Sequence, residues 1–185
     1  MTAVLTGRLL VATPALVDPH FLRTVLLILD HDEDGTIGVV LNRPSELLVE
    51  DGLPGWERLA PEPPVIFHGG PVSPGSAICL GHRRPGSPAA SGFRPVTDRI
   101  GLIDLERDVD DLLPAVDAAR VCSGYAGWGP GQLQGEIDEG AWFVVDATEG
   151  DATSSEPERL WERVLRRQPP PLSWVSLHPL DPTLN

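Results

Sequence analysis

Short apolar runs separated by turn residues dominate the chain. Segment 8–12 is apolar, and two further apolar runs, 24–29 and 37–41, flank an acidic linker that ends in Asp34-Gly35. A polar linker that ends in Asp-Gly between β-branched or leucine-rich runs predicts a β-hairpin. Both runs are apolar at nearly every position, so we expect their strands to be covered on both faces.

The rest of the chain predicts further strands with helices inserted between them. Strands are expected at 65–67, 77–80, 100–105, 121–125 and 142–145, and helices at 108–119, after Gly131 and at 155–167. Because there is no regular strand–helix–strand alternation, the predicted class is α+β. The length of 185 residues favours a single domain over 1–185, with a mobile loop at 83–95 and an extended, proline-rich tail at 169–185.

Charge narrows the choice of partners. The chain has 14 arginines, no lysine and 27 acidic residues, a net charge of −13, so we do not expect direct binding to nucleic acid. A local positive excess occurs at 82–99, where Arg83, Arg84, Arg94 and Arg99 face the single acid Asp98. An anionic partner would therefore have to bind this loop.

Hydropathy and cysteine content bear on location. The longest apolar run, 25–29, is far shorter than the roughly 20 residues that span a bilayer, and residues 1–10 do not resemble a signal peptide. The two cysteines, Cys79 and Cys122, do not form a disulfide framework. We therefore expect a cytoplasmic protein that does not bind membranes.

No metal or cofactor motif is complete. Asp30, Asp32, Asp34 and Gly35 match the start of an EF-hand loop, but Leu41 stands where the bidentate glutamate should be, and the flanks are strand-like. None of the five histidines pairs at i, i+4, and there is no Cys-x-x-Cys. We predict no metal and no cofactor, and interpret the acidic turn as solvated.

Three features leave alternatives open. Cys122 follows a strand and precedes a glycine-rich turn, so it is either a nucleophile with a histidine base or a buried structural cysteine. His31 lies beside a strand end and could turn inward. The segment 124–131 places glycines before a helix, where backbone N–H groups could hold a carboxylate or phosphate; alternatively, the glycines let Trp128 pack closely.

Several motifs in order resemble one family. They are Leu9-Leu10-Val11-Ala12-Thr13-Pro14, Asp18-Pro19-x-Phe21-x-Arg23, His31 with the Gly35 turn, Gly38-Val39-Val40-Leu41-Asn42-Arg43-Pro44, Gly69-Gly70-Pro71, Gly124-Tyr125-Ala126-Gly127-Trp128 and Gly131-Gln132-Leu133-x-x-Glu136-Ile137 with Ala141-Trp142. Together they resemble the YqgE/AlgH family over essentially the whole chain.

The resemblance implies a single α+β domain with a bent, mostly antiparallel sheet rolled into a partial barrel, with helices packed around it, in a bacterial cytoplasmic protein. It implies no known reaction, and the family's label as a transcriptional regulator comes from one branch linked to alginate production. Many members carry a cysteine two residues before the turn histidine, where this chain has Leu29. A redox role for that thiol is therefore not implied here.

Our first hypothesis is a non-enzymatic regulatory or small-ligand/protein-binding module, with an unidentified small molecule or protein as partner. Its ligand cleft would be lined by family-like residues at strand ends and turns, where function concentrates: Pro14, Asp18, Arg23, His31, Asn42, Arg43, Gly69, Gly70, Tyr125, Trp128, Gln132 and Glu136. A separation of more than about 20 Å, a small-domain diameter, between the Asn42-Arg43 turn and 124–132 would refute the cleft.

Two other hypotheses remain. One is a hydrolase or thiol-dependent enzyme using His31 or Cys122, which requires a nucleophile and a base about 3 Å apart in a pocket. The other, which we rank third, is a DNA-binding transcriptional regulator, whose affinity would fall steeply with salt.

Overall fold

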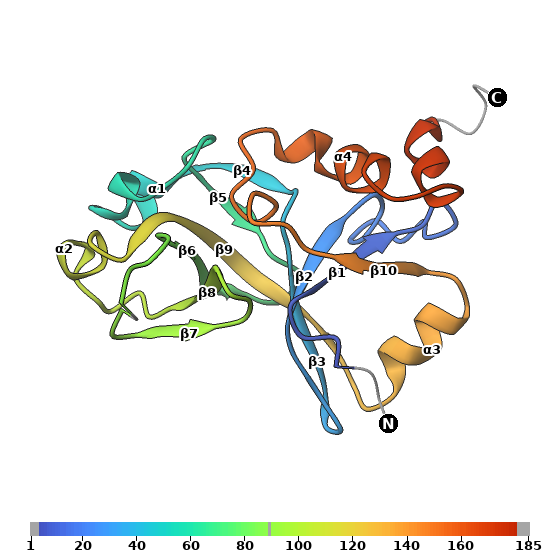
Figure 1. Ribbon diagram of the computed structural model, residues 1–185, viewed down its shortest axis with the longest axis horizontal. Helices are drawn as coiled ribbons and strands as arrows, with labels where there is room; N and C mark the ends of the chain where they lie inside the picture. The colour runs from blue at the N-terminus through green and yellow to red at the C-terminus, as the bar shows by residue number, and fades with distance from the viewer. Residues whose placement is uncertain (1–3, 89, 181–185) are drawn as a thin grey trace.

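The strands of the protein form one continuous sheet that curls into a half-barrel (Figure 1). The computed structural model describes residues 4–88 and 90–180. Within them the main strand order is β10-β1-β2-β3-β9-β6-β8-β7, and β4 pairs with β5, which also pairs with β9. The strands are β1 (Arg8–Ala12), β2 (Val25–Asp32), β3 (Gly35–Val40), β4 (Pro44–Leu48), β5 (Val65–His68), β6 (Val72–Arg83), β7 (Phe93–Pro95), β8 (Ile100–Ile103), β9 (Val116–Trp128) and β10 (Trp142–Asp146).

The predicted hairpin is confirmed as β2 and β3. Its strands extend into the acidic linker, so that Asp32 pairs with Gly35 and only two residues form the turn. The Asp32 carboxylate accepts hydrogen bonds from the backbone N–H groups of Asp34 and Gly35, at 2.9 and 3.2 Å. The aspartates therefore lie on and beside strands, in a setting unlike the helix-flanked loop of an EF-hand.

Both faces of the sheet near β1–β3 are covered, as the apolar runs predict. On one face, Leu9 and Leu27 pack with Leu160 and Val164 of helix α4 (Leu160–Arg166). On the other face, Leu10, Ile28 and Trp142 pack with Leu133 of helix α3 (Gln132–Asp138). Burial on two sides explains why these strands carry so few polar residues.

The long strand β9 joins the two halves of the sheet. It pairs antiparallel with β6 over most of its length, antiparallel with β3 near its end, and parallel with β5 at Cys122 and Ser123. Figure 1 shows it running diagonally from the end of the molecule that holds α2 to the hairpin of β2 and β3. Because β9 is shared, the ends of β3 and β5 are held at one place along it.

The prediction of a helix at 108–119 is wrong. Only one turn forms there, α2 (Val109–Leu112), and β9 begins at Val116. Pro114 has no N–H to continue a helix, and residues from Val116 onward gain hydrogen bonds by pairing with β6. The proline-rich segment 46–64 contains part of β4, helix α1 (Val49–Gly52) and the 3-10 helix η1 (Trp56–Arg58).

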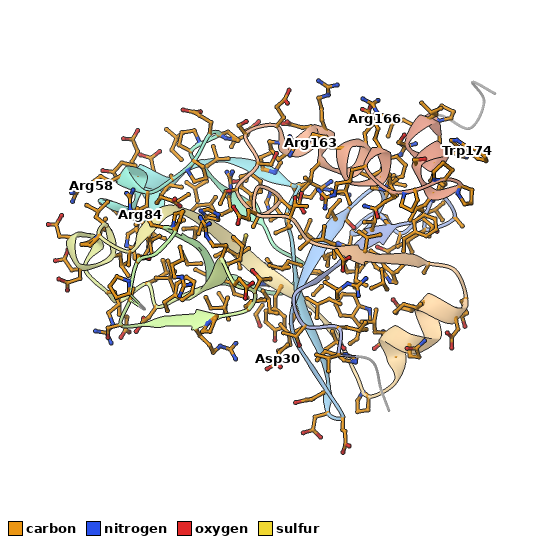
Figure 2. All side chains as sticks on the ribbon, in the orientation of Figure 1. Asp30, Arg58, Arg84, Arg163, Arg166 and Trp174 are labelled. Atoms are coloured by element: carbon orange, nitrogen blue, oxygen red, sulfur yellow. The ribbon has the colours of Figure 1, made fainter. Side chains whose placement is uncertain are left out.

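Two other regions differ from expectation. A 3-10 helix, η3 (Leu172–Leu177), occupies part of the tail predicted as extended, and residues 181–185 of that tail lie outside the described residues. The loop at 83–95 includes β7, and its mobility stays a prediction. The helix predicted at 155–167 is η2 (Pro157–Arg159) followed by α4, and Figure 2 shows Arg163 and Arg166 of α4 pointing away from the sheet.

Candidate functional site

The turns that carry family-like residues meet beside β9. The carbonyl of Gly69 accepts a hydrogen bond from Val40 N at 2.8 Å, and Gly69 N donates to Ser123 O at 2.8 Å. His68 N donates to Arg43 O, also at 2.8 Å. The segments 42–43, 69–70 and 123–125 are therefore direct neighbours.

Gly70 makes this close approach sterically possible. Its φ is +154°, and a Cβ added there would lie 2.2 Å from the carbonyl carbon and oxygen of Tyr125. No side chain fits at that distance, so a glycine is required where this turn crosses β9.

A small pocket opens at this junction. It has a volume of about 230 Å³ and is lined by Pro19, His20, Val40, Arg43, His68, Gly70 and Pro71; we call it the Arg43 pocket. Three of these side chains can carry positive charge, and no lining residue within the described chain is acidic. Nη2 of Arg43 donates to Leu22 O at 2.7 Å, which holds the guanidinium against the loop between β1 and β2.

Asn42 and Arg23 hold the backbone behind this pocket. Asn42 is 8% exposed; its Oδ1 accepts from Val25 N and its Nδ2 donates to Arg23 O, both at 2.9 Å. The Arg23 guanidinium lies 4.1 Å over the Trp161 ring and donates to the carbonyls of His178 and Pro179. Burial lowers the pKa of Arg23. Both side chains are committed to internal contacts.

Pro14 and Asp18 belong to the same loop between β1 and β2. Asp18 Oδ1 accepts a hydrogen bond from His20 N at 2.8 Å, so the carboxylate fixes the turn that presents His20. Pro14 is partly buried at the start of the loop and does not line the Arg43 pocket.

The residues around Glu136 form a separate network. Glu136 Oε2 accepts hydrogen bonds from the indole N–H groups of Trp128 at 2.9 Å and Trp142 at 2.8 Å, and Oε1 accepts from Gln132 at 3.0 Å. The Phe21 ring contacts both indoles, with centroids 6.3 and 5.6 Å away. This network anchors α3 to β9 and β10, and its polar atoms are occupied by internal partners.

His31 turns toward its cross-strand neighbour. Its Nδ1 lies 2.7 Å from Thr36 Oγ1, and Nε2 is buried without a partner among the described residues. A cavity of about 200 Å³ adjoins the pair. A hydroxyl and an imidazole are thus within hydrogen-bond distance, but Thr36 is 5% exposed and directly opposite His31 in the sheet, so the register of β2 and β3 explains the contact.

The cysteines lie in the core. Cys122 is fully buried, and desolvation raises the pKa of its thiol to about 12, although the Arg120 guanidinium opposes the shift. Burial also raises the pKa of Cys79, with Cys122 adding to the shift. Both cysteines are free thiols. A protonated, inaccessible thiol is a poor nucleophile.

The arginines of the 82–99 loop are dispersed rather than gathered. Arg99 pairs with Glu149 at 3.3 Å and donates to Arg83 O at 2.7 Å, while Arg84 donates to Leu113 O at 3.1 Å. Arg94 lies 3.8 Å from Asp30 on the hairpin. The guanidinium groups of Arg84, Arg94 and Arg99 thus have partners within the chain, whereas Arg83 Nε is buried without one among the described residues.

Sequence reasoning did not select His20 and His68 for the site. Both histidines were considered only as metal ligands, by their spacing. The available signal is that each adjoins a family-like motif, Asp18-Pro19 before His20 and Gly69-Gly70 after His68. Within 4–88 and 90–180, no cluster of three or more metal-binding side chains is present, and no helix has the length and apolar character to cross a bilayer.

Comparison with known proteins gives consistent matches over the whole chain. A family model described as AlgH-like matches residues 9–173. A UPF0301 protein of Streptomyces coelicolor is 55% identical over 98% of this chain and 95% of its own length, and a UPF0301 protein of Mycobacterium marinum is 45% identical over 98% and 92%.

Two solved structures share the fold. The crystal structure of a Corynebacterium diphtheriae protein aligns with a TM-score of 0.90 and 34% identity, covering 95% of this chain and 93% of that one. The solution structure of the AlgH protein from Pseudomonas aeruginosa aligns with a TM-score of 0.69 and 26% identity, covering 98% and 97%. The α+β class and the rolled, mostly antiparallel sheet expected from the sequence are thus confirmed.

Proposed function

The chain belongs to the AlgH-like (UPF0301) family, and on that premise we propose that it is a non-enzymatic binding module whose small-molecule ligand carries an anionic group held in the Arg43 pocket. The residues that line the Arg43 pocket are the main support for this proposal. In a chain of net charge −13, this pocket combines Arg43, His20 and His68, and the described residues put no carboxylate in its lining. Guanidinium and imidazole N–H groups are strong donors to carboxylate and phosphate oxygens.

The Arg43 side chain is already oriented for this role. One of its five N–H donors is used by Leu22 O, and the described residues provide no other hydrogen-bond partner for the guanidinium. Because one nitrogen is already anchored, the Arg43 side chain would lose less conformational entropy when a ligand binds. The backbone of Gly70 and the ring of Pro71 give the pocket a rigid wall.

The alternatives receive less support. The Cys122 thiol is fully buried with a pKa raised to about 12, and the His31–Thr36 pair is explained by strand register. Arg84, Arg94 and Arg99 of the 82–99 loop make contacts within the chain, so the described residues offer little support for a basic surface of the kind that binds duplex DNA. A cytoplasmic, regulatory role through small-molecule or protein contacts stays part of the proposal.

Titration with sulfate tests the pocket. We expect sulfate to shift the amide NMR signals of His68 and Gly70, which line the Arg43 pocket.

Variants separate this site from general anion binding. Arg43→Gln should abolish the shifts, Arg43→Lys should retain part of the affinity, and Arg166→Gln on the outer face of α4 serves as a control that removes the same charge (Figure 2). Unchanged indole signals of Trp128 would show that Arg43→Gln is folded. Equal sulfate binding by Arg43→Gln and the wild type would refute the proposal.

A further inference from the structure

A second open site lies at the other end of the hairpin. The tip of β2 and β3 projects beyond the body of the sheet, and one of its faces continues across β9 to β6 (Figure 1). We call this the hairpin face. It surrounds a pocket of about 400 Å³, whose lining includes Asp30, Asp32, Asp34, Ile37, Val72 and Tyr125.

Sheet register places apolar side chains at the centre of this face. Ile37 pairs with Gly127 of β9 and with Asp30 of β2, and Val72 of β6 pairs with Tyr125. The Ile37 side chain is 43% exposed and Val72 is 36% exposed. Exposed apolar side chains grouped in a pocket indicate a surface that contacts another molecule.

Gly127 leaves a hollow between these side chains. A Cβ at Gly127 would meet only the edge of the Tyr125 ring, at 3.6 Å, so the strand backbone is accessible there. On the opposite face of β9, by contrast, Ala126 is fully buried and Trp128 is 6% exposed. The hairpin face is therefore the side of these strands that the described part of the chain leaves uncovered.

The rim of the hairpin face is acidic. Asp30, Asp32 and Asp34 line the pocket, and its described lining contains no basic residue. One guanidinium of the chain already approaches from outside, since Arg94 Nη1 lies 3.8 Å from Asp30 Oδ2. Figure 2 shows Asp30 at the exposed base of the hairpin. Among residues 4–88 and 90–180, the carboxylates of Asp32 and Asp34 have no counterion.

We propose that the hairpin face docks a protein segment that carries basic side chains next to aliphatic ones. Basic groups complement the three carboxylates, and aliphatic groups cover Ile37 and Val72. Nucleic acid and anionic membranes are disfavoured because the rim would repel their phosphates. A bare cation is disfavoured because the centre of the pocket is apolar.

Designed peptides test both halves of this recognition on the full chain. The probe is the peptide Arg-Leu-Arg-Leu-Arg-amide with fluorescein on its N-terminal amine, followed by anisotropy, with amide NMR shifts of Ile37 and Gly127 to map the site. One control peptide has serine in place of leucine, and the other has glutamate in place of arginine. We expect measurable binding of the first peptide only.

Matched variants distinguish binding at the hairpin face from nonspecific attraction to the negative charge of the chain. The triple variant Asp30→Asn, Asp32→Asn, Asp34→Asn should weaken binding by about tenfold or more. The control triple Glu46→Gln, Glu50→Gln, Asp51→Asn removes the same charge from exposed positions elsewhere and should have little effect. Ile37→Ser should weaken binding while leaving the charge unchanged.

Three results would overturn the proposal. Equal weakening by both triple variants would reduce the binding to nonspecific charge attraction. Equal affinity for the serine peptide would remove the apolar component. A failure of the arginine–leucine peptide to bind, or NMR shifts confined to another part of the chain, would exclude the hairpin face as the docking surface.

Discussion

Replacing Arg120 should destabilise the protein more than replacing any exposed arginine. Arg120 is 1% exposed and has no carboxylate partner among the described residues. Its guanidinium lies 4.1 Å over the Phe67 ring and donates to backbone carbonyls, of Pro63 and Ser154 at 2.9 Å each and of Glu62 at 3.2 Å. The side chain thus connects β9 to two separate loops.

The cost of Arg120→Met can be estimated from these contacts. A hydrogen bond to a charged donor contributes about 1.5–3 kcal/mol net, so losing the two short ones costs about 3–6 kcal/mol. The burial that lowers the pKa of Arg120 to about 10 shows that the charged form is held at a cost, which the variant recovers in part. We therefore expect a loss near the lower bound, about 3 kcal/mol, or about 6–12 °C in Tm for a chain of this size.

Urea unfolding followed by tryptophan fluorescence and circular dichroism measures this loss. The control is Arg58→Met, which removes an exposed ion pair with Asp110 and should cost less than about 1 kcal/mol. Arg120→Lys keeps the charge but loses the planar fork and the stacking on Phe67, so it should be no more stable than Arg120→Met. Wild-type stability of either Arg120 variant would refute the reasoning.

The other predictions concern Cys122, Glu136 and Gly70. Because the pKa of Cys122 is raised from about 9 to about 12, the folded state keeps a proton above pH 9 that the unfolded state loses. The free energy of unfolding should therefore fall above pH 9, by at most about 1.4 kcal/mol per pH unit for this thiol. Cys122→Ala should reduce that slope, measured by urea unfolding at several pH values. Glu136→Gln places an amide donor against the amide of Gln132 and should cost about 1–3 kcal/mol, read from thermal unfolding; no change would show that the network is dispensable. Gly70→Ala forces a Cβ against a β9 carbonyl and should cost at least about 3 kcal/mol, whereas Gly75→Ala, in open space, is the control.

The sequence predicts the hairpin and the doubly covered strands because local pattern alone determines them. Asp34-Gly35 marks the turn, and uninterrupted apolar runs indicate burial on both faces. The helix expected at 108–119 fails for the opposite reason. Its apolar spacing fits a helix, but pairing with β6, which begins more than 20 residues earlier in the chain, decides the structure from Val116 onward.

For the candidate site, too, the sequence predicts some features and not others. The motifs predict that Arg43 and Gly70 gather at strand ends, and the structure brings them together. It assigns Asn42, Arg23 and Glu136 to internal hydrogen bonds, which residue type cannot distinguish from ligand contacts. The sequence also does not predict that Arg120 is buried, because an arginine in a mixed sequence is usually solvated.

The shared position of β9 has a consequence for synthesis and folding. The β2–β3 hairpin ends at Val40, but β3 pairs with residues 126–128 of β9, much later in the chain. Strand β5 likewise pairs with Cys122 and Ser123 of β9. During translation the first hairpin therefore emerges long before the strand that completes its sheet. Such distant pairings slow folding. The apolar strand β3 therefore remains without its partner on β9 until more than two thirds of the chain has been made.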